Sequence, residues 1–534
     1  MIFKNINKKN IFLYLIFAVT AYILTFIIKE ADADLWARLA VGSLFFQTGH
    51  VLTQDIFAYT PTKTLWIDHE WGSGVIFYTF IHCFGDFGLF ILKFTLIFTI
   101  FLLVNKIIQL NCKKSVNIDI SMLVLLAFAI FPSVVATVRS QLFTYTFFVL
   151  WICILEKIKR DDNRLLWIFP ATMLIWVNLH GGFVTGLGLI IIYTIGEALN
   201  RKNILKYLKI FAITLPVTLI NPYGINFWKY ILEAISMQRP HIFEWQHFTL
   251  QGPFISLFGI SVHMFLGFEI IAVLTIILAI KLIITKSDID WTKILLIIIT
   301  LYLGLKHQRH LVLFVLTAFS LLYSYYINIF KSIGNFIQCK HSENMIIKLI
   351  KIKNISIISI LMLLIMSQNI FSTKIYAVPS FYPVGAIEFI KQNNLSGNLF
   401  VPYRWGSYAM WKLYPQCLVS VDGRYEEVYP DSVFSMAAEF SGDIDTNWHL
   451  YKKDEHQNEN WQKFIDEYHT DIIIMPRIQS NFVKLKKLKN WNIAYADNLS
   501  YVLLPNNLTN KLYIIPDFRN PIYWHEDLSK KIKL

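Results

Sequence analysis

The chain has 534 residues, of which 55% are hydrophobic, 16% are aromatic and only 16% are charged. Its mean hydropathy of +0.49 is too high for an ordinary soluble globular protein of this length. The net charge of +13 does not indicate a nucleic-acid partner, because the Lys and Arg residues fall in short clusters between apolar segments. The composition therefore predicts a polytopic α-helical membrane protein.

Apolar runs long enough to cross a bilayer recur through the first 372 residues, since a helix needs roughly 20 residues to cross the hydrocarbon. The runs predict about eleven transmembrane helices, at residues 11–28, 87–105, 119–137, 141–156, 165–179, 182–199, 207–220, 261–281, 291–305, 311–329 and 355–372. They define a membrane domain at residues 1–374, with a long first outer loop at residues 29–86, and a soluble C-terminal domain at residues 375–534.

Basic residues predict the orientation, because Lys and Arg are retained on the cytoplasmic side of membrane helices. They cluster before the first span and then in every second connection, as at Lys113, Arg160 and Arg201. The alternation predicts a cytoplasmic N-terminus and an extracytoplasmic C-terminal domain. The first 33 residues also resemble a signal peptide, but the apolar stretch is long and Asp32 is unfavourable at a cleavage site, so we expect the segment to be retained.

Two carboxylates, Asp32 and Asp34, stand where the chain leaves the first span. Leu35 and Leu39 follow at helical spacing, which predicts a helix lying along the membrane interface. An N-cap role would explain Asp34, since a carboxylate suits a helix N-terminus. Asp32 has no such role, and carboxylates beside a membrane cost desolvation unless they have a polar task. Both are therefore candidate catalytic residues.

A second polar cluster in the same loop, Asp68, His69 and Glu70, gives candidate substrate-binding residues. It is not an H-E-x-x-H zinc motif, because position 73 is Ser73. The five cysteines stand apart, without the spacing of a zinc site or a disulfide framework. The sequence thus predicts no resident metal and no certain cofactor, although carboxylates and His are chemically able to bind a divalent cation.

Four more polar residues lie at the outer ends of spans, namely Arg139, His180, Lys306 and Arg309. Taken singly, each has a structural explanation as an interfacial anchor or a polar cap. Together they oppose the positive-inside trend and predict a substrate-binding face. Arg139 is the first candidate for a phosphate ligand, because it stands in a tight hairpin and arginine offers a planar fork that matches phosphate oxygens.

The C-terminal domain is predicted to be α/β or α+β. Buried strands are expected in GNLFVPY, CLVSVD, DIIIMP and SYVLLP, with helices near residues 384–393, 404–413, 431–440, 460–468 and 481–488. Arg404, Asp422 and Arg424 fall beside strand ends, among aromatic residues. Such a group suits sugar binding, and it equally suits a buried Arg–Asp pair with core aromatics.

The strings DADLWARLAVG, DIFAYT, WIDHEW, RSQLFTY, NLHGGFVTGLG and NPYG, with PYRWGSYAMWKL and VDGRYEEVY near the C-terminus, run from about residue 30 to about residue 430. They resemble a group of bacterial multi-spanning membrane proteins placed with the C-type (GT-C) glycosyltransferase superfamily. The resemblance implies a catalytic aspartate in the first outer loop, and Asp32 and Asp34 are the matching positions. The superfamily's frequent Asp-Glu or Glu-Asp pair is replaced by Asp-Ala-Asp, so the resemblance does not decide between them. Its metal dependence varies and is not carried over.

The resemblance also implies a function. We expect an enzyme of the bacterial inner membrane that transfers a sugar from a polyprenyl-phosphate carrier to an envelope glycan, lipid or protein on the outer face. A lipid-linked glycan ligase or polymerase would carry the same outer-face residues, and a non-catalytic scaffold for envelope assembly is a third hypothesis. A transporter is disfavoured, because the spans hold few ionisable residues.

Overall fold

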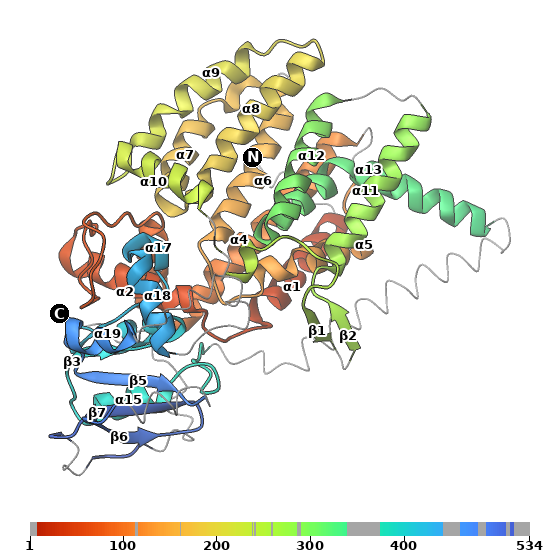
Figure 1. Ribbon diagram of the computed structural model, residues 1–534. Coiled ribbons are helices and arrows are strands. Elements are labelled where there is room, and N and C mark those ends of the chain that lie inside the picture. Colours follow the sequence, from red (N-terminus) through yellow and green to blue (C-terminus); the bar gives the residue numbers. More distant parts are fainter. Residues whose placement is uncertain are drawn as a thin grey trace.

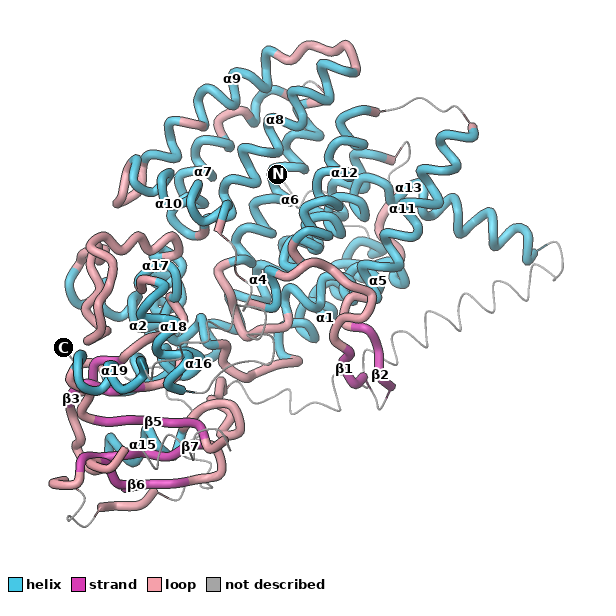
Figure 2. Tube along the Cα trace, viewed as in Figure 1, coloured by secondary structure: helices cyan, strands magenta, loops and turns pink. Residues whose placement is uncertain are grey.

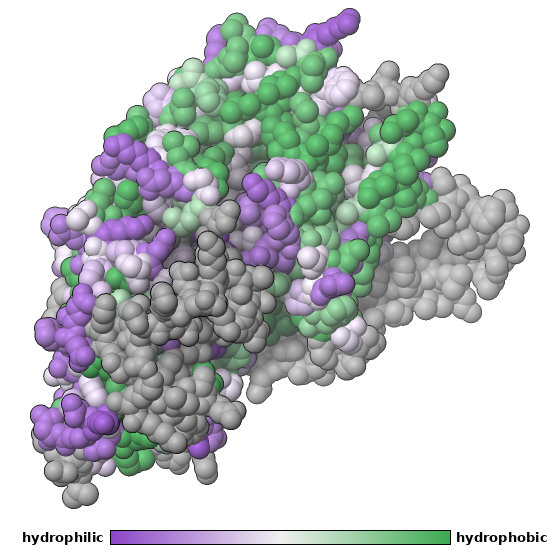
Figure 3. All heavy atoms as spheres, in the orientation of Figure 1, coloured by the Kyte–Doolittle hydropathy of each residue, from purple (hydrophilic) through white to green (hydrophobic). Residues whose placement is uncertain are grey.

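A computed structural model describes residues 8–112, 116–160, 162–237, 239, 242–257, 260–285, 290–338, 374–441, 460–478, 488–508 and 513–516. A helical part formed by residues up to 338 lies against a smaller domain that contains a β-sheet (Figure 1). The strands gather in this smaller domain, apart from one hairpin beside the helices (Figure 2). Apolar side chains cover the helical part around α11 and α12, while polar side chains dominate the visible surface of the smaller domain (Figure 3).

Five helices among the described residues are long and apolar enough to cross a membrane. They include α4 (Asp86–Asn111), α6 (Gln141–Ile158) and α11 (Leu266–Ile284). The other two combine a 3₁₀ turn with the helix that follows it: η2 (Gly181–Phe183) with α8 (Val184–Leu199), and η5 (Gln308–His310) with α13 (Leu311–Gln338). The helical part also contains α1 (Lys8–Phe26), α5 (Ile120–Val134), α7 (Ile168–Leu179), α9 (Leu205–Thr214) and α12 (Trp291–Lys306).

The helices match the predicted spans with two corrections. The predicted span at residues 207–220 is broken, because α9 ends at Thr214 and a 3₁₀ turn, η3 (Pro216–Leu219), follows at a proline that has no N–H to continue the helix. The predicted span at 261–281 begins as strand β2 (Ile260–His263), which pairs with β1 (Phe254–Leu257), and becomes helical only at Leu266. Residues 355–372 lie outside the described part, so the number of spans stays a prediction.

The connections sort to two ends of the helical part. At one end, the Lys159 Nζ lies 2.7 Å from Glu197 Oε1 and 2.8 Å from Asp290 Oδ1, and Arg160 donates to Asn111. These residues belong to connections predicted to be cytoplasmic. The connections that carry Asp32, Arg139, His180 and Arg309 meet at the opposite ends of the same helices. The alternation of basic and acidic connections therefore corresponds to a real division of the molecule.

The helix predicted for the first outer loop is confirmed as α2 (Ala33–Thr48), and its apolar stripe packs against protein. Its residues from Leu35 to Leu44 are all buried, between α3 (Trp71–Phe84) and the C-terminal domain. A side chain at Gly42 would meet the Gly74 backbone, with its Cβ 2.2 Å from the Gly74 carbonyl oxygen. Two glycines thus allow α2 and α3 to cross in backbone contact, and protein covers the stripe that was expected to face lipid.

A buried lysine fixes the two helix ends that lead into this region. Lys93 on α4 is fully buried, and its Nζ donates to the Ala136 carbonyl at 2.6 Å and to the Thr25 carbonyl at 3.5 Å. These carbonyls stand at the C-terminal ends of α5 and α1, where the helix dipole favours a cation. The segments that carry Asp32 and Arg139 therefore leave adjacent, tethered helix ends.

The smaller domain is a mixed five-stranded sheet of order β4-β3-β5-β7-β6. The four predicted strands are confirmed as β3 (Gly397–Phe400), β4 (Cys417–Val419), β5 (Ile472–Pro476) and β7 (Ser500–Pro505). β4, β3 and β5 are parallel, whereas β7 pairs antiparallel with β5 and with the unpredicted β6 (Trp491–Ala496). β6 was not predicted; it is an edge strand in which Tyr495 is the one buried side chain.

Four predicted helices of this domain are also confirmed: α15 (Val384–Gln392), α16 (Tyr403–Leu413), α18 (Asp431–Ser441) and α19 (Asn460–Tyr468). The predicted helix at 481–488 lies almost wholly outside the described residues. A short helix, α17 (Tyr425–Val428), follows β4. The domain packs on α2, where the Trp36 ring lies 5.2 Å from the Tyr408 ring and 6.0 Å from the Tyr382 ring, centroid to centroid. The C-terminal domain therefore covers the helix that follows Asp32.

We predict that the C-terminal domain is extracytoplasmic, which cysteine labelling tests. In a cysteine-free background, Asn498→Cys places a thiol in the exposed turn between β6 and β7, and Lys202→Cys places a matched thiol in an exposed connection predicted to be cytoplasmic. A membrane-impermeant maleimide added to intact spheroplasts is expected to label Asn498→Cys and to label Lys202→Cys only after lysis. The reverse pattern would contradict the predicted orientation.

Candidate active site

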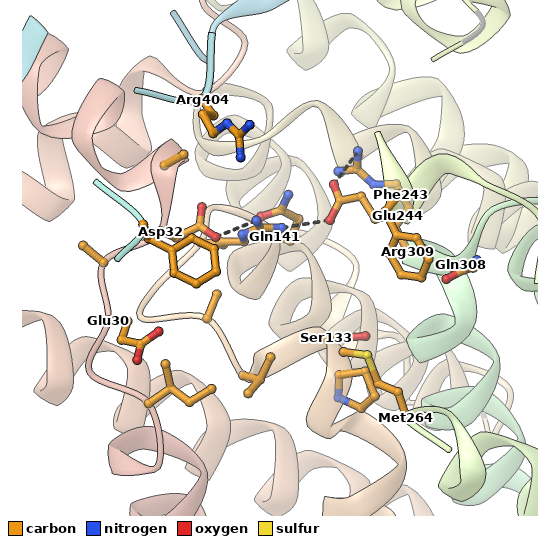
Figure 4. Close-up of a pocket in the computed structure, with 18 of the residues that line it drawn as sticks. Glu30, Asp32, Ser133, Gln141, Phe243, Glu244, Met264, Gln308, Arg309 and Arg404 are labelled. Atoms are coloured by element: carbon orange, nitrogen blue, oxygen red, sulfur yellow. Dashed lines mark hydrogen bonds and ion pairs between the residues drawn. The ribbon is translucent and has the colours of Figure 1, made fainter. Parts of the chain in front are cut away.

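A cavity of about 510 Å³ opens where the helical part meets the C-terminal domain (Figure 4). Its charged lining residues come from five separate segments: Glu30 and Asp32 from the chain after α1, Arg139 from the turn before α6, Glu244 from the 3₁₀ turn η4 (Phe243–Trp245), Arg309 from η5, and Arg404 from α16. Apolar residues line much of the rest, among them Ile28, Pro132, Val135, Ala136, Phe243, Met264, Phe265, Val378 and Phe381, and Ser133, Gln141, Tyr145, Gln308 and Tyr382 add polar groups. The cavity therefore offers both charged groups and an apolar wall.

Asp32 is the N-cap of α2, a role that the sequence suggested for Asp34. Its Oδ1 accepts a hydrogen bond from the Asp34 backbone N at 3.0 Å, and its Oδ2 accepts one from Arg139 Nη2 at 2.6 Å. The Asp32 backbone N donates to Thr137 Oγ1 at 3.2 Å. Asp32 is thus held on both carboxylate oxygens by the helix N-terminus and an arginine.

Asp34 lies in the first turn of α2 and is held less tightly than Asp32. Its side chain is 46% exposed, and its Oδ2 lies 3.7 Å from Arg139 Nε. Although almost half of the Asp34 side chain is accessible to solvent, desolvation by the surrounding protein, followed by the charge of Asp32, raises its pKa to about 7, and Arg139 opposes the rise. A carboxylate with a pKa near neutral pH and an accessible oxygen is suited to accept a proton.

Arg139 joins three carboxylates. Besides Asp32 and Asp34, it reaches Glu244 of η4 (Phe243–Trp245), since Arg139 Nη1 donates to Glu244 Oε2 at 2.8 Å. The dashed lines in Figure 4 run from Asp32 to Glu244 through this guanidinium. Arg309 lies 3.4 Å from the other oxygen of Glu244, and its guanidinium stacks 4.4 Å from the Trp245 ring. These contacts hold the two arginines at the cavity.

A second polar cluster contains Asp68, His69 and Glu70, which the sequence grouped, together with His180, which the sequence treated separately. Asp68 is buried and pairs with Arg38 of α2. Burial opposes the ionisation of Glu70, but the charges of His69 and Arg38 hold its pKa at about 2. Burial lowers the pKa of His180 to about 3, so this imidazole is neutral, with Nε2 3.3 Å from Glu70 Oε1. The charge of Glu70 also raises the pKa of Asp34, which places this cluster beside the first.

Arg424 and Asp422, for which the sequence allowed either sugar binding or a buried ion pair, form a buried ion pair. Their side chains are fully buried, with Arg424 Nη2 2.6 Å from Asp422 Oδ2 and Arg424 Nη1 2.5 Å from Asp55 of the first outer loop. The Arg424 guanidinium also lies 4.9 Å from the Phe57 ring and 4.6 Å from the Trp66 ring. We therefore assign this pair to holding the loop on the C-terminal domain, whereas Arg404 lines the cavity.

Lys306 is exposed at the end of α12, while Arg309 lines the cavity three residues later. Sequence reasoning missed Glu244 as a site residue, together with Arg38 and with Glu427 of α17. Arg38 carried a usable signal, because a lone arginine one helical turn after Asp34 interrupts an apolar helix. Glu244 and Glu427 carried none, since only the tertiary fold brings them to their arginines.

Comparison with known proteins supports the fold. No protein-family model matches the chain, and no curated protein matches it. Among solved structures, the crystal structure of the Archaeoglobus fulgidus oligosaccharyltransferase in the apo form aligns with a TM-score of 0.56 at 10% identity, over 96% of this chain and 75% of that chain. The arrangement of apolar helices followed by a sheet-containing domain is thus similar to an oligosaccharyltransferase fold.

We predict that Arg424→Met strongly destabilises the protein. The change leaves Asp422 and Asp55 buried without their cation, so the free energy of unfolding should fall by about 3–5 kcal/mol. Thermal unfolding of the purified protein in detergent measures the effect. Arg164→Met is the control, because Arg164 is 89% exposed in its pair with Asp162 and should leave Tm unchanged. Equal Tm values for Arg424→Met and the wild type would contradict the assignment.

Proposed function

We propose that the protein is a membrane glycosyltransferase that transfers a sugar from a polyprenyl-phosphate carrier to an envelope glycan, lipid or protein on the outer face of the bacterial inner membrane. The observation that carries the proposal is the cavity in which Asp32, Arg139, Glu244 and Arg309 meet, beside Asp34. The likeness to an oligosaccharyltransferase fold and the resemblance of the sequence motifs to the GT-C superfamily agree with it.

In the proposed reaction, Asp34 is the general base. An acceptor hydroxyl attacks the anomeric carbon of the carried sugar, and Asp34 takes the hydroxyl proton as the new C–O bond forms. The bond between the anomeric carbon and the phosphate oxygen breaks, and the lipid phosphate leaves with the electron pair. Asp32 is the less suitable base, because the helix N-terminus and Arg139 already hold both of its oxygens.

The growing charge on the leaving phosphate needs a cation. Arg309 is better placed than Arg139 for this role, because both terminal nitrogens of Arg139 already donate to carboxylates, while Arg309 has a 3.4 Å contact with Glu244 and lines the cavity. Arg404 lines the same cavity from the C-terminal domain. The apolar residues between these arginines, such as Met264 and Phe265, suit the first units of a prenyl chain.

A resident divalent cation does not fit the carboxylates as they stand. The carboxylates of Asp32 and Glu244 each accept a hydrogen bond from the Arg139 guanidinium. Among the described residues, no group of three or more His, Cys, Asp or Glu side chains is arranged to hold a metal ion. We therefore derive no step through a metal.

We predict that Asp34→Asn abolishes transfer. The substitution keeps the size of the side chain but removes the base, so turnover should fall about 100-fold or more. Mass spectrometry of lipid-linked sugars and envelope glycans, in cells lacking the gene and complemented with each variant, measures the loss. Asp32→Asn is expected to have a smaller effect that includes loss of the N-cap. Normal glycans with Asp34→Asn and with the double variant would place the base elsewhere.

The same experiment separates the other hypotheses. A ligase or polymerase of lipid-linked glycans would change the length or attachment of a glycan in cells lacking the gene, instead of leaving one sugar missing. A scaffold for envelope assembly would give complementation by the Asp34→Asn variant.

We predict that Arg309→Lys weakens donor binding by about tenfold. Lysine keeps the charge but loses the planar fork and the stack on Trp245, so one charge-assisted bidentate contact is lost. Arg139→Lys should also weaken donor use, because one ammonium cannot serve Asp32 and Glu244 as the fork does. Binding of a short-chain polyprenyl phosphate to the purified protein in detergent, followed by calorimetry, measures the affinity. Lys306→Ala is the control, and equal affinities for the wild type, Arg309→Lys and Arg309→Ala would exclude Arg309.

A further inference from the structure

Glu244 is a charged residue without a role in the reaction described above. It lies on η4, and its two oxygens are divided between two arginines: Oε2 accepts from Arg139 Nη1 at 2.8 Å, and Oε1 lies 3.4 Å from Arg309 Nη1. Burial opposes its ionisation, but Arg309 and Arg139 hold the pKa of Glu244 below its usual value. Glu244 is therefore an anion that orients both arginines.

The guanidinium of Arg139 shows what this orientation does. Its two terminal nitrogens are occupied, Nη2 by Asp32 at 2.6 Å and Nη1 by Glu244 at 2.8 Å. Its third nitrogen, Nε, is buried without a hydrogen-bond partner and stops 3.7 Å from Asp34 Oδ2. The two strong contacts of Arg139 thus go to Asp32 and Glu244, and Asp34 receives only the long one.

We propose that Glu244 is a positioning residue that, together with Asp32, keeps Arg139 from forming a close ion pair with Asp34 and so leaves Asp34 able to accept a proton. This inference rests on the proposed role of Asp34, but the contacts that carry it do not depend on the identity of the sugar or the acceptor. Asp32 alone cannot give this effect, because it binds one side of the guanidinium and would leave Arg139 free to turn toward Asp34.

The charges around Asp34 determine what the loss of Glu244 would do. Asp34 faces Asp32 from its own loop, Arg139 from the hairpin before α6, Glu244 from η4 and Glu70 from the start of α3, and its charge is also felt by Tyr382 of the C-terminal domain. Three of these groups are carboxylates, and Arg139 is the one cation among them. Glu244→Gln removes one repelling anion and replaces the charge-assisted contact of Arg139 Nη1 by a weaker neutral one, so the pKa of Asp34 should fall.

Carbodiimide labelling tests the inference without a substrate. Dicyclohexylcarbodiimide adds to a protonated carboxyl group, so the pH at which labelling is half-maximal reports the ionisation of that group. The purified protein in detergent is labelled between pH 5 and pH 9, and fragmentation mass spectrometry separates Asp34 from Asp32 in the same peptide. The wild type should show half-maximal labelling of Asp34 near pH 7. In Glu244→Gln the midpoint should fall by about one pH unit, which is a tenfold change in the ionisation equilibrium.

Two further variants complete the experiment. Glu30→Gln removes a carboxylate that lines the same cavity, and it should leave the Asp34 midpoint where it is in the wild type. Glu244→Asp keeps the charge on a shorter side chain, and it should give a smaller fall than Glu244→Gln while preserving the fold if Glu244→Gln does not. An unchanged or raised Asp34 midpoint in the folded Glu244 variants would overturn the inference. If the Asp34 midpoint falls in Glu244→Gln but the wild-type protein transfers no sugar, the proposed function is overturned and the positioning role stands.

Discussion

The ion pairs of Arg139 are the interaction on which the arrangement of the site depends. They join Asp32 after α1, Asp34 in α2 and Glu244 in η4. In the sequence, Asp32 is 107 residues from Arg139, and Asp34 and Glu244 are each 105 residues from it. Partly buried charges of this kind are retained only when they are paired, since an unpaired one would cost several kcal/mol. The segments that carry Asp32 and Arg139 are also held close together, because Lys93 donates hydrogen bonds to carbonyls at the C-terminal ends of α1 and α5.

The C-terminal domain also helps to form the site. It covers α2 through Tyr382 and Tyr408, and it holds the first outer loop through Arg424 and Glu427. Glu427 lies 2.9 Å from His69 Nδ1 and 3.8 Å from Arg38 Nη2, so an acidic residue from this domain completes the cluster around Glu70. Arg404 adds a cation to the cavity. A change in the docking of this domain would therefore reach Asp34 through α2.

The sequence was informative where a local pattern determined the structure. Apolar runs located most of the described helices, although not α3 or α10 (Ile225–Ser236), and continuous apolar strings located the strands β3, β4, β5 and β7, because burial and periodicity are properties of neighbouring residues. Hydropathy did not predict the break at Pro216 or the hairpin before Leu266, where a lost N–H and strand pairing override an apolar run.

Contacts between distant segments were not predictable in the same way. Asp32 and Asp34 were both found as candidate bases from their position at a membrane exit, but the N-cap role was considered for Asp34, and only the geometry shows that Asp32 caps α2. Arg424 and Asp422 stand beside aromatic residues, a pattern that fits a sugar site or a protein core. Asp55, 369 residues from Arg424, forms a further ion pair with it in the buried cluster, and nothing in the sequence indicated that contact. Glu244 is identified as a site residue only by its contacts with Arg139 and Arg309 in the folded protein.

The most direct test of the account is a cryo-electron-microscopy structure of the protein with a polyprenyl-phosphate sugar bound. The account predicts that the phosphate lies within hydrogen-bonding distance of Arg309, that the prenyl chain follows the apolar wall beside Met264 and Phe265, and that the anomeric carbon faces Asp34. A donor phosphate bound at the opposite end of the helices, beside Lys159 and Asp290, would contradict it.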